Sequence, residues 1–221
     1  MAKDLTYVVA GGANGIGAAI SEALRNEGFD VYVLDIATLE KDGTNLKVDL
    51  SDEGSVIKAA GQLPETIGGL VLSIGVMRRG TILESSEADY DLLMDSNVKA
   101  TWLAMKHLVP RVRENGTVVQ LSSGHVLDPE ADPGIYTLSK KAVTSLAEIL
   151  ELTRPDLDVK YVYPGPVLTN LLLQGRNEED RERITKIAQN PEFIAKKTVA
   201  LIKSDKKSIK FDPKKWDYYE E

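Results

Sequence analysis

The sequence predicts an α/β protein built on a doubly wound parallel sheet with helices on both faces. Three observations lead to this fold class: short β-branched runs alternate with helical patterns, a glycine-rich loop follows the first run, and polar motifs fall at the ends of the runs. Alternating strands and helices imply right-handed crossovers and a parallel sheet that is covered on both sides. A length of 221 residues fits one such domain, so we expect a single unit over residues 1–221.

The expected elements follow the chain in order. The β-branched runs predict strands at residues 6–10, 31–35, 45–48, 70–73, 117–122 and 159–163, with a last short strand near 208–211. Long helical patterns cover residues 88–114 and 135–153, and a further helix is expected at about 191–203. The stretch from residue 35 to residue 45 is too short for a full crossover helix.

The composition excludes several classes of function. There is no cysteine, which excludes disulfides and thiolate metal sites, and with only His107 and His125 we expect no metal site. The formal charge of −7 argues against non-specific nucleic-acid binding, because neutralising phosphates needs a basic face. The apolar run at residues 5–20 is broken by glycines, and a membrane helix needs roughly 20 apolar residues. We expect a cytoplasmic protein that acts on a small molecule, without nucleic-acid or membrane partners.

The glycine loop Gly11-x-x-x-Gly15-x-Gly17 lies between the first strand and the first helix, the context in which such a motif binds a dinucleotide. Gly11 would permit the tight turn, Gly15 would let the backbone approach a pyrophosphate, and Gly17 would allow the helix to pack closely. The start of the helix supplies amide donors for the phosphates. The alternative is an ordinary flexible turn.

Asp35 ends the second strand at the spacing expected of an acidic ribose ligand. Its carboxylate can accept hydrogen bonds from adenosine ribose hydroxyls and would repel a 2′-phosphate. Ile36 and Ala37 follow, where an NADP site would need a cation. We therefore predict NAD as the cofactor. The alternative is that Asp35 is only a polar strand end.

The motif Tyr136-x-x-x-Lys140 places two side chains on one face of a helix. A free phenol titrates at about 10 and is a poor base at neutral pH, so we expect the Lys140 ammonium to lower the pKa of Tyr136. The phenol could then act as proton donor and acceptor. Ser123, upstream of the tyrosine, adds a hydroxyl that can hold a substrate oxygen; its neighbour Ser122 is expected in the strand.

Taken in order from about residue 5 to residue 203, these motifs resemble the short-chain dehydrogenase/reductase family. The resemblance implies a Rossmann-type fold and hydride transfer between NAD and a secondary alcohol or carbonyl, with Tyr136 as general acid or base. Lys140 would also bind nicotinamide ribose hydroxyls, and Ser123 would steady the reacting oxygen. Asn97 would organise the neighbouring helix and a water relay to the lysine.

The resemblance also implies a dinucleotide site made from the strand ends and the loops that follow them. Its expected residues are Gly11, Asn14, Gly15, Ile16, Gly17, Asp35, Asp49, Leu50, Ser73, Gly75, Tyr136, Lys140, Pro164, Gly165, Val167 and Thr169. Asp49 would meet the adenine amino group, with Leu50 beside it. Asn14 stands where NADP-using relatives often carry a basic residue. After the last of the long strands, the Val167 backbone and the Thr169 hydroxyl would hold the carboxamide or the pyrophosphate.

Three segments depart from the family pattern. Leu72-Ser73-Ile74-Gly75 stands where relatives usually have Asn-Asn-Ala-Gly, so Ser73 is either a working substitute or an incidental core hydroxyl. The short stretch from residue 35 to 45 would trim the face near the adenosine. The tail at about 212–221 lacks the usual glycine-rich ending, which puts the tetramer contacts often built there in doubt.

The motifs place a group of substrate-pocket candidates near the reacting centre: Met77, Arg78, His125, Tyr163 and Leu168. They imply a mostly apolar pocket with one or two donors, compatible with a sugar, a steroid, a hydroxy acid or a small ketone. Residues 170–190 are charged and weakly apolar. They form either a solvated helix with its linker or, as the equivalent family segment does, a mobile lid over the substrate.

The two long helical patterns carry apolar stripes, made of Leu93, Val98, Trp102 and Met105 on the first and Val143, Leu146 and Leu150 on the second. The stripes fit core packing against the sheet. The resemblance implies in addition that the outer faces of these helices meet a second subunit, in a homodimer or homotetramer.

Two other functions share parts of this pattern. A non-catalytic dinucleotide-binding sensor on the same fold is the main alternative, motivated by Ser73 and the tail and opposed by the four catalytic residues. A sugar-nucleotide epimerase shares Tyr-x-x-x-Lys and the glycine loop but usually needs a larger substrate domain than this length allows.

Overall fold

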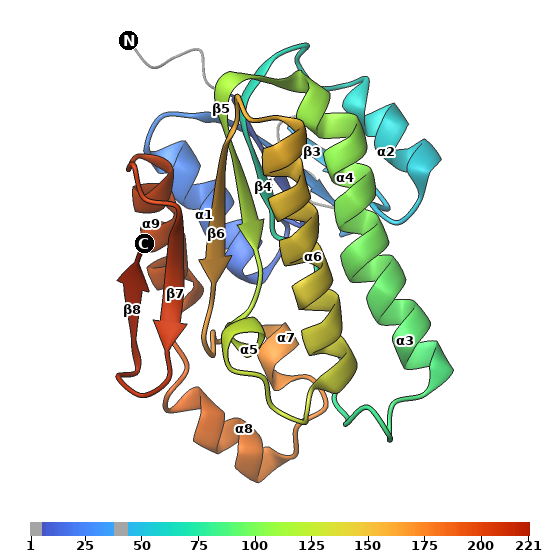
Figure 1. The fold of residues 1–221 in the computed structure, drawn as a ribbon, viewed down its shortest axis with the longest axis vertical. Helices are drawn as coiled ribbons and strands as arrows, with labels where there is room; N and C mark the ends of the chain where they lie inside the picture. The colour runs from blue at the N-terminus through green and yellow to red at the C-terminus, as the bar shows by residue number, and fades with distance from the viewer. Residues whose placement is uncertain (1–5, 38–43) are drawn as a thin grey trace.

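The computed structural model describes residues 6–37 and 44–221, and it confirms the predicted fold class (Figure 1). These residues form one eight-stranded sheet in the order β3-β2-β1-β4-β5-β6-β7-β8, parallel except for the last pair. The strands are β1 (Thr6–Ala10), β2 (Asp30–Asp35), β3 (Asn45–Lys47), β4 (Ile67–Leu72), β5 (Val112–Leu121), β6 (Asp158–Tyr163), β7 (Ser208–Asp212) and β8 (Asp217–Glu220). The strand order reverses between β1 and β4, which is where such sheets bind ligands.

Helices cover both faces of the sheet. They are α1 (Gly15–Asn26), α2 (Glu53–Ala60), α3 (Glu87–Leu93), α4 (Ala100–Leu108), α5 (Gly124–Leu127), α6 (Gly134–Thr153), α7 (Asn170–Leu173), α8 (Glu178–Thr185) and α9 (Pro191–Ile202). In Figure 1, α4 and α6 lie on the near face and α1 behind the sheet, while α7 and α8 lie below the arrowheads of β5 and β6. None of the described helices is both long and apolar enough to span a membrane.

The core consists of two apolar clusters, one on each face of the sheet. Along β1, Tyr7 and Val9 belong to the cluster under α1 and α9, whereas Val8 and Ala10 belong to the cluster under α2, α4 and α6. This division follows from the alternation of side chains along a strand. Because both faces are covered, the central strands β1 and β4 read in the sequence as nearly continuous apolar runs.

The expected helix at residues 88–114 is correct in place but wrong in its end and its regularity. Between α3 and α4 the chain forms a π-helical segment, η1 (Met94–Lys99), and after α4 a 3₁₀ turn, η2 (Val109–Arg111). Residues 112–114 belong to β5, which begins earlier than residue 117 because Asn115, with φ 58°, stands at a register shift between β4 and β5. A single irregular residue lets the strand continue past the break. Ser122 lies just beyond β5 and not in it.

The apolar stripes predicted on the two long helices serve mainly as core. Leu93, Met105 and Val143 are buried, and Leu146 and Leu150 pack against the larger cluster. Of the predicted stripe residues, Trp102 is the one that is largely exposed, at 46%. The prediction that these stripes pack in the core against the sheet is therefore confirmed.

The tail departs from the sequence expectation. Beyond the predicted strand at 208–211, the chain turns at Trp216 (φ 53°) and returns as β8, which pairs antiparallel with β7. This hairpin was not predicted, because a lone short strand gives little periodic signal. The expectation for residues 35–45 falls largely on residues 38–43, outside the described residues; β2 and β3 pair directly in parallel.

Candidate active site

A cavity of about 1140 Å³ opens at the carboxyl ends of the parallel strands. Most of the residues predicted for the dinucleotide and for catalysis line it: Gly11, Asn14, Gly15, Ile16, Asp35, Asp49, Leu50, Ser73, Gly75, Ser123, Tyr136, Lys140, Pro164, Gly165, Val167 and Thr169. Of the predicted residues, Gly17 and Asn97 do not line the cavity. Each packs against a loop that does, Gly17 against Gly11 and Asn97 against Val76. The structure thus brings together segments from six loops along the chain.

The glycine loop forms a tight cradle at the start of α1. Gly15 has φ +54° and lines the cavity, so its backbone can face a ligand without a side chain in the way. A Cβ on Gly17 would lie 2.1 Å from the Gly11 carbonyl oxygen, so only glycine lets the helix pack this closely on the turn. A bare turn that leads into a helix N-terminus suits a pyrophosphate. The residues present therefore fit a dinucleotide.

The end of the cavity predicted to bind adenosine carries two carboxylates. Asp35 accepts hydrogen bonds from the amides of Ala13 and Ala37, each at 2.9 Å, which hold its carboxylate at the end of β2. Asp49 accepts from the amide and hydroxyl of Ser51, and these bonds lower the pKa of the Asp49 carboxyl. Both groups are therefore oriented by their own surroundings and keep further lone pairs for a ligand.

Tyr136 and Lys140 lie one turn apart on α6, both buried, as the motif predicted. Lys140 donates through Nζ to the Ile74 carbonyl oxygen at 3.0 Å, and its Nζ lies 5.9 Å from the centre of the Tyr136 ring. Ser123 caps α5, and its Oγ lies 3.2 Å from Nδ1 of His125. A cluster of hydroxyl, phenol, imidazole and ammonium thus meets at one wall of the cavity.

The expectation that Lys140 lowers the pKa of Tyr136 is wrong for this arrangement. Burial raises the pKa of Tyr136 to about 12, with a hydrogen bond from Ser123 acting in the opposite direction. Burial also lowers the pKa of Lys140 to about 8. The sequence motif specifies which residues meet, but burial disfavours the charged form of both groups.

Asn97 ties three segments together from inside η1. Its Oδ1 accepts from the Val76 amide at 2.7 Å, and its Nδ2 donates to the Val76 carbonyl at 3.0 Å and to Ser139 Oγ at 2.9 Å. The loop after β4 is thereby fixed against α6. A Cβ on Gly75, in that same loop, would lie 2.9 Å from Lys140 Nζ, so the loop approaches the lysine closely.

The loop after β6 is held by the tail, which sequence reasoning did not foresee. The Gly165 amide donates to the Tyr218 hydroxyl at 2.9 Å, and a Cβ on Gly165 would lie 2.5 Å from the Phe211 ring. Farther along, the indole of Trp216 donates to the Ile187 carbonyl at 3.0 Å, which links the hairpin to the segment after α8. The concentration of aromatic residues in a charged tail was the available signal.

Two of the five substrate-pocket candidates line the cavity, Met77 and His125. The other three are corrections. Arg78 lies 3.8 Å from Asp89 in an ion pair, Tyr163 is buried in the sheet core beside Tyr161, and Leu168 is not part of the lining. Tyr163, the last residue of β6, faces the core because successive strand residues face opposite sides of the sheet. Arg78 and Leu168 lie in loops, where family order does not settle which way a side chain points.

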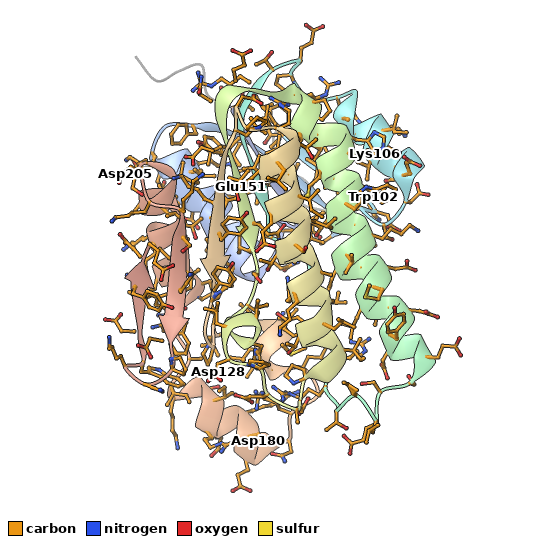
Figure 2. All side chains as sticks on the ribbon, in the orientation of Figure 1. Trp102, Lys106, Asp128, Glu151, Asp180 and Asp205 are labelled. Carbon is orange, nitrogen blue, oxygen red and sulfur yellow. The ribbon has the colours of Figure 1, made fainter. Side chains whose placement is uncertain are left out.

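Charged residues that the sequence did not single out line the same end of the cavity: Arg79, Asp128, Glu130, Asp132, Arg176, Asp180 and Arg183. Figure 2 shows Asp128 and Asp180 at the lower end of the molecule, beside α5 and α8. No group of three or more metal-ligating side chains that could hold an ion occurs within residues 6–37 and 44–221.

Residues 6–180 match the family described as short chain dehydrogenase. The chain is 32% identical over 202 residues to the oxidoreductase UcpA of Salmonella typhimurium, with 81% of this chain and 76% of UcpA covered. The ligand-free aldohexose dehydrogenase of Thermoplasma acidophilum has a TM-score of 0.80 at 23% identity, over 91% of this chain and 88% of that one. A small-chain dehydrogenase in complex with NADPH has a TM-score of 0.79 at 20% identity, over 91% and 92%. Both solved structures share the fold.

Proposed function

The chain belongs to the short-chain dehydrogenase family of oxidoreductases, and on this premise we propose that it transfers a hydride between NAD and a secondary alcohol or carbonyl substrate. One observation carries the proposal: Ser123, Tyr136 and Lys140 line the same cavity as the glycine loop. A substrate in this cavity could therefore contact both the proton-transferring side chains and a bound dinucleotide.

The chain's own residues would divide the work of proton transfer. When bound, the nicotinamide supplies or accepts the hydride. Tyr136 gives the proton of its hydroxyl to the carbonyl oxygen in reduction and takes a proton from the alcohol in oxidation. Ser123 steadies the same substrate oxygen. Lys140, whose pKa is lowered to about 8, keeps most of its charge at pH 7 and stabilises the phenolate as it forms.

Asp35 supports the choice of NAD. Its carboxylate lines the cavity, and the lining residues next to it within the described chain, Ile36, Val48, Asp49, Leu50 and Ser51, include no lysine or arginine. Among the described residues, a 2′-phosphate would meet a carboxylate there and no lining cation beside it. One neighbour with this fold binds NADPH, so the fold alone does not select NAD and the local residues must decide.

We also propose a homodimer or homotetramer through the outer faces of α4 and α6. Trp102, which Figure 2 shows on the outside of α4, is 46% exposed, and Leu138, Ile149 and Leu152 are exposed on α6. Exposed apolar groups gathered on neighbouring helices favour association. Sedimentation at micromolar concentration should show a dimer or larger species that Trp102→Ser weakens; a monomer would contradict this use of the two faces.

The remaining expectations stay predictions. These are one catalytic domain over residues 1–221, a lid formed by residues 170–190, and a cytoplasmic location. The contact between Trp216 and Ile187 supports a lid that is anchored at its far end.

The direct experiment follows absorbance of the reduced nicotinamide across a panel of secondary alcohols and ketones, with NAD and NADP in parallel. Turnover with at least one pair is expected. Tight NADH binding without turnover of any member would instead favour the non-catalytic sensor.

A further inference from the structure

Two arginines from distant parts of the chain meet in the wall of the cavity. Arg79 follows β4, and Arg176 lies between α7 and α8. A Cβ on Gly175 would lie 3.9 Å from Cγ and Cδ of Arg79, so the segment that carries Arg176 packs on the Arg79 side chain.

Arg79 forms an ion pair with the carboxylate of Asp132. Its Nη1 donates to Asp132 Oδ2 at 3.0 Å, and the other oxygen of Asp132 accepts from the Gly80 amide at 2.8 Å. The Nε of Arg79 is buried and has no hydrogen-bond partner. Asp132 is thus committed to Arg79 and the backbone, while Arg79 retains unused donor capacity.

Arg176 has no carboxylate of its own. Its Nε donates to the Leu172 carbonyl at 3.0 Å, but within residues 6–37 and 44–221 no acidic side chain pairs with its guanidinium. Arg176 is half-buried, and burial together with the positive charge of Arg79 lowers its pKa. A half-buried cation beside another cation is unfavourable unless an anion joins it.

The other acids of this wall do not fill that role. Asp180 pairs with Arg183 at 3.0 Å, and both Asp128 and Glu130 are exposed to solvent. Asp180 and Asp132 attract Arg176 without a direct ion pair, because they pair with Arg183 and Arg79. The guanidinium of Arg176 therefore keeps donors for a group that enters the cavity.

Both arginines line the cavity, and the charge of each reaches His125 beside the reacting centre. Burial is the main cause that lowers the pKa of His125, and the charges of Arg79 and Arg176 act in the same direction. The His125 ring in turn contacts Ser123 Oγ at 3.2 Å and lies edge-on to the Tyr136 ring at 6.3 Å. An anion held by Arg176 would belong to the substrate molecule whose oxygen reaches Ser123 and Tyr136.

We propose that Arg176, supported by Arg79, forms a subsite for an anionic oxygen group on the substrate, a carboxylate or a phosphate. The planar fork of a guanidinium matches both groups. This inference rests on the proposed function and narrows it: the substrates are hydroxy or oxo acids, or phosphate esters that carry a secondary alcohol, and not neutral alcohols.

A binding experiment tests the subsite without turnover. Butanoate, butanamide and inorganic phosphate are titrated calorimetrically into the protein, Arg176→Gln and Lys186→Gln. Lys186 is an exposed lysine beyond α8 that does not line the cavity, so it controls for loss of charge. Butanoate or phosphate should bind, and Arg176→Gln should weaken that binding about tenfold to a hundredfold, as expected for a hydrogen-bonded charge. Lys186→Gln should leave the affinity for both anions unchanged.

The comparison of butanoate with phosphate identifies which anion the subsite accepts. Absence of binding by both anions, equal binding of butanamide, or unchanged binding in Arg176→Gln would overturn the subsite.

A turnover experiment separates this inference from the proposed function. Oxidation of 3-hydroxybutanoate is compared with that of its methyl ester, and glycerol 3-phosphate with glycerol. The charged member should be preferred at least tenfold in kcat/KM, and Arg176→Gln should erase the preference by raising the KM of the charged substrate. Turnover that favours the neutral member would refute the subsite alone. Binding that depends on Arg176 without any turnover would refute the oxidoreductase alone.

Discussion

The dinucleotide end and the reacting end of the cavity are built by different means. At the first, a glycine turn, a helix N-terminus and the carboxylate of Asp35 come from one continuous stretch of chain, β1 to β2. At the second, Ser123, Tyr136, Arg176 and Trp216 come from segments far apart in the sequence. The first end therefore depends on local backbone geometry, and the second depends on side chains that tertiary packing must hold in register.

The largest expected effect removes one atom from the reacting end. Tyr136→Phe keeps the buried ring but loses the transferable proton, so kcat should fall roughly 10²–10⁴-fold while NADH binding is retained. Fluorescence titration with NADH and initial rates check both halves of the statement. Tyr90→Phe, at an exposed ring on α3, is the control. A Tyr136→Phe enzyme with ordinary rates would show that another group moves the proton.

At the dinucleotide end, the test is the choice of cofactor. The protein should prefer NAD over NADP by about a hundredfold in kcat/KM, because two effects of about 1.4 kcal/mol, lost hydrogen bonds and like-charge repulsion, act together at Asp35. Asp35→Ser should narrow the preference, and adding Ile36→Arg should provide a donor for the 2′-phosphate. Asp30→Ser, at the other end of β2, should change nothing. Equal use of NADP by the parent protein would mean that Asp35 does not bind the ribose.

The buried Lys140 at the reacting end makes the free energy of unfolding of the protein depend on pH. Burial lowers the pKa of Lys140 from an ordinary 10.5 to about 8, so between these values the unfolded chain binds more protons than the folded one, and the free energy of unfolding rises with pH. From pH 8 to pH 10 the gain should be about 2 kcal/mol. Above about pH 10 the raised pKa of Tyr136 acts in the opposite direction. Urea unfolding of the parent and of Lys140→Met measures this. The same slope in both proteins would exclude Lys140 as the cause.

The smallest expected effect concerns the tail, where the Tyr218 hydroxyl holds the loop that contains Gly165. Tyr218→Phe keeps the ring contacts with Phe211 and Phe193 but leaves the Gly165 amide without its acceptor. Loss of one such hydrogen bond costs about 1 kcal/mol, which corresponds to a fall in Tm of roughly 2–4 °C and a rise of about fivefold in the KM for NADH. Tyr219→Phe on the same strand removes a half-exposed hydroxyl for which no acceptor is found within the described chain. Equal effects of the two substitutions would show that the hairpin does not position the loop.

Much of the dinucleotide end, and the Tyr136–Lys140 pair at the reacting end, could be predicted because their signals are local. Gly11, Gly15 and Gly17 are neighbours in the sequence, and Tyr136 and Lys140 share a helical face by spacing alone. The alternating runs likewise predicted seven of the eight described strands. In each case the interacting groups lie within a few residues, or the pattern repeats with the period of the element.

Tertiary structure decided the rest. The shift at Asn115, the return of the chain at Trp216 and the approach of Arg176 to Arg79 join residues whose sequence neighbourhoods give no sign of one another. The pKa values of Tyr136 and Lys140 moved away from the values expected from their pairing, because burial is a property of the folded surroundings and not of spacing. The sequence by itself therefore determined the fold class, the glycine loop and which of the proposed catalytic side chains share a helical face. Packing between distant segments determined the electrostatics around them and the shape of the substrate end.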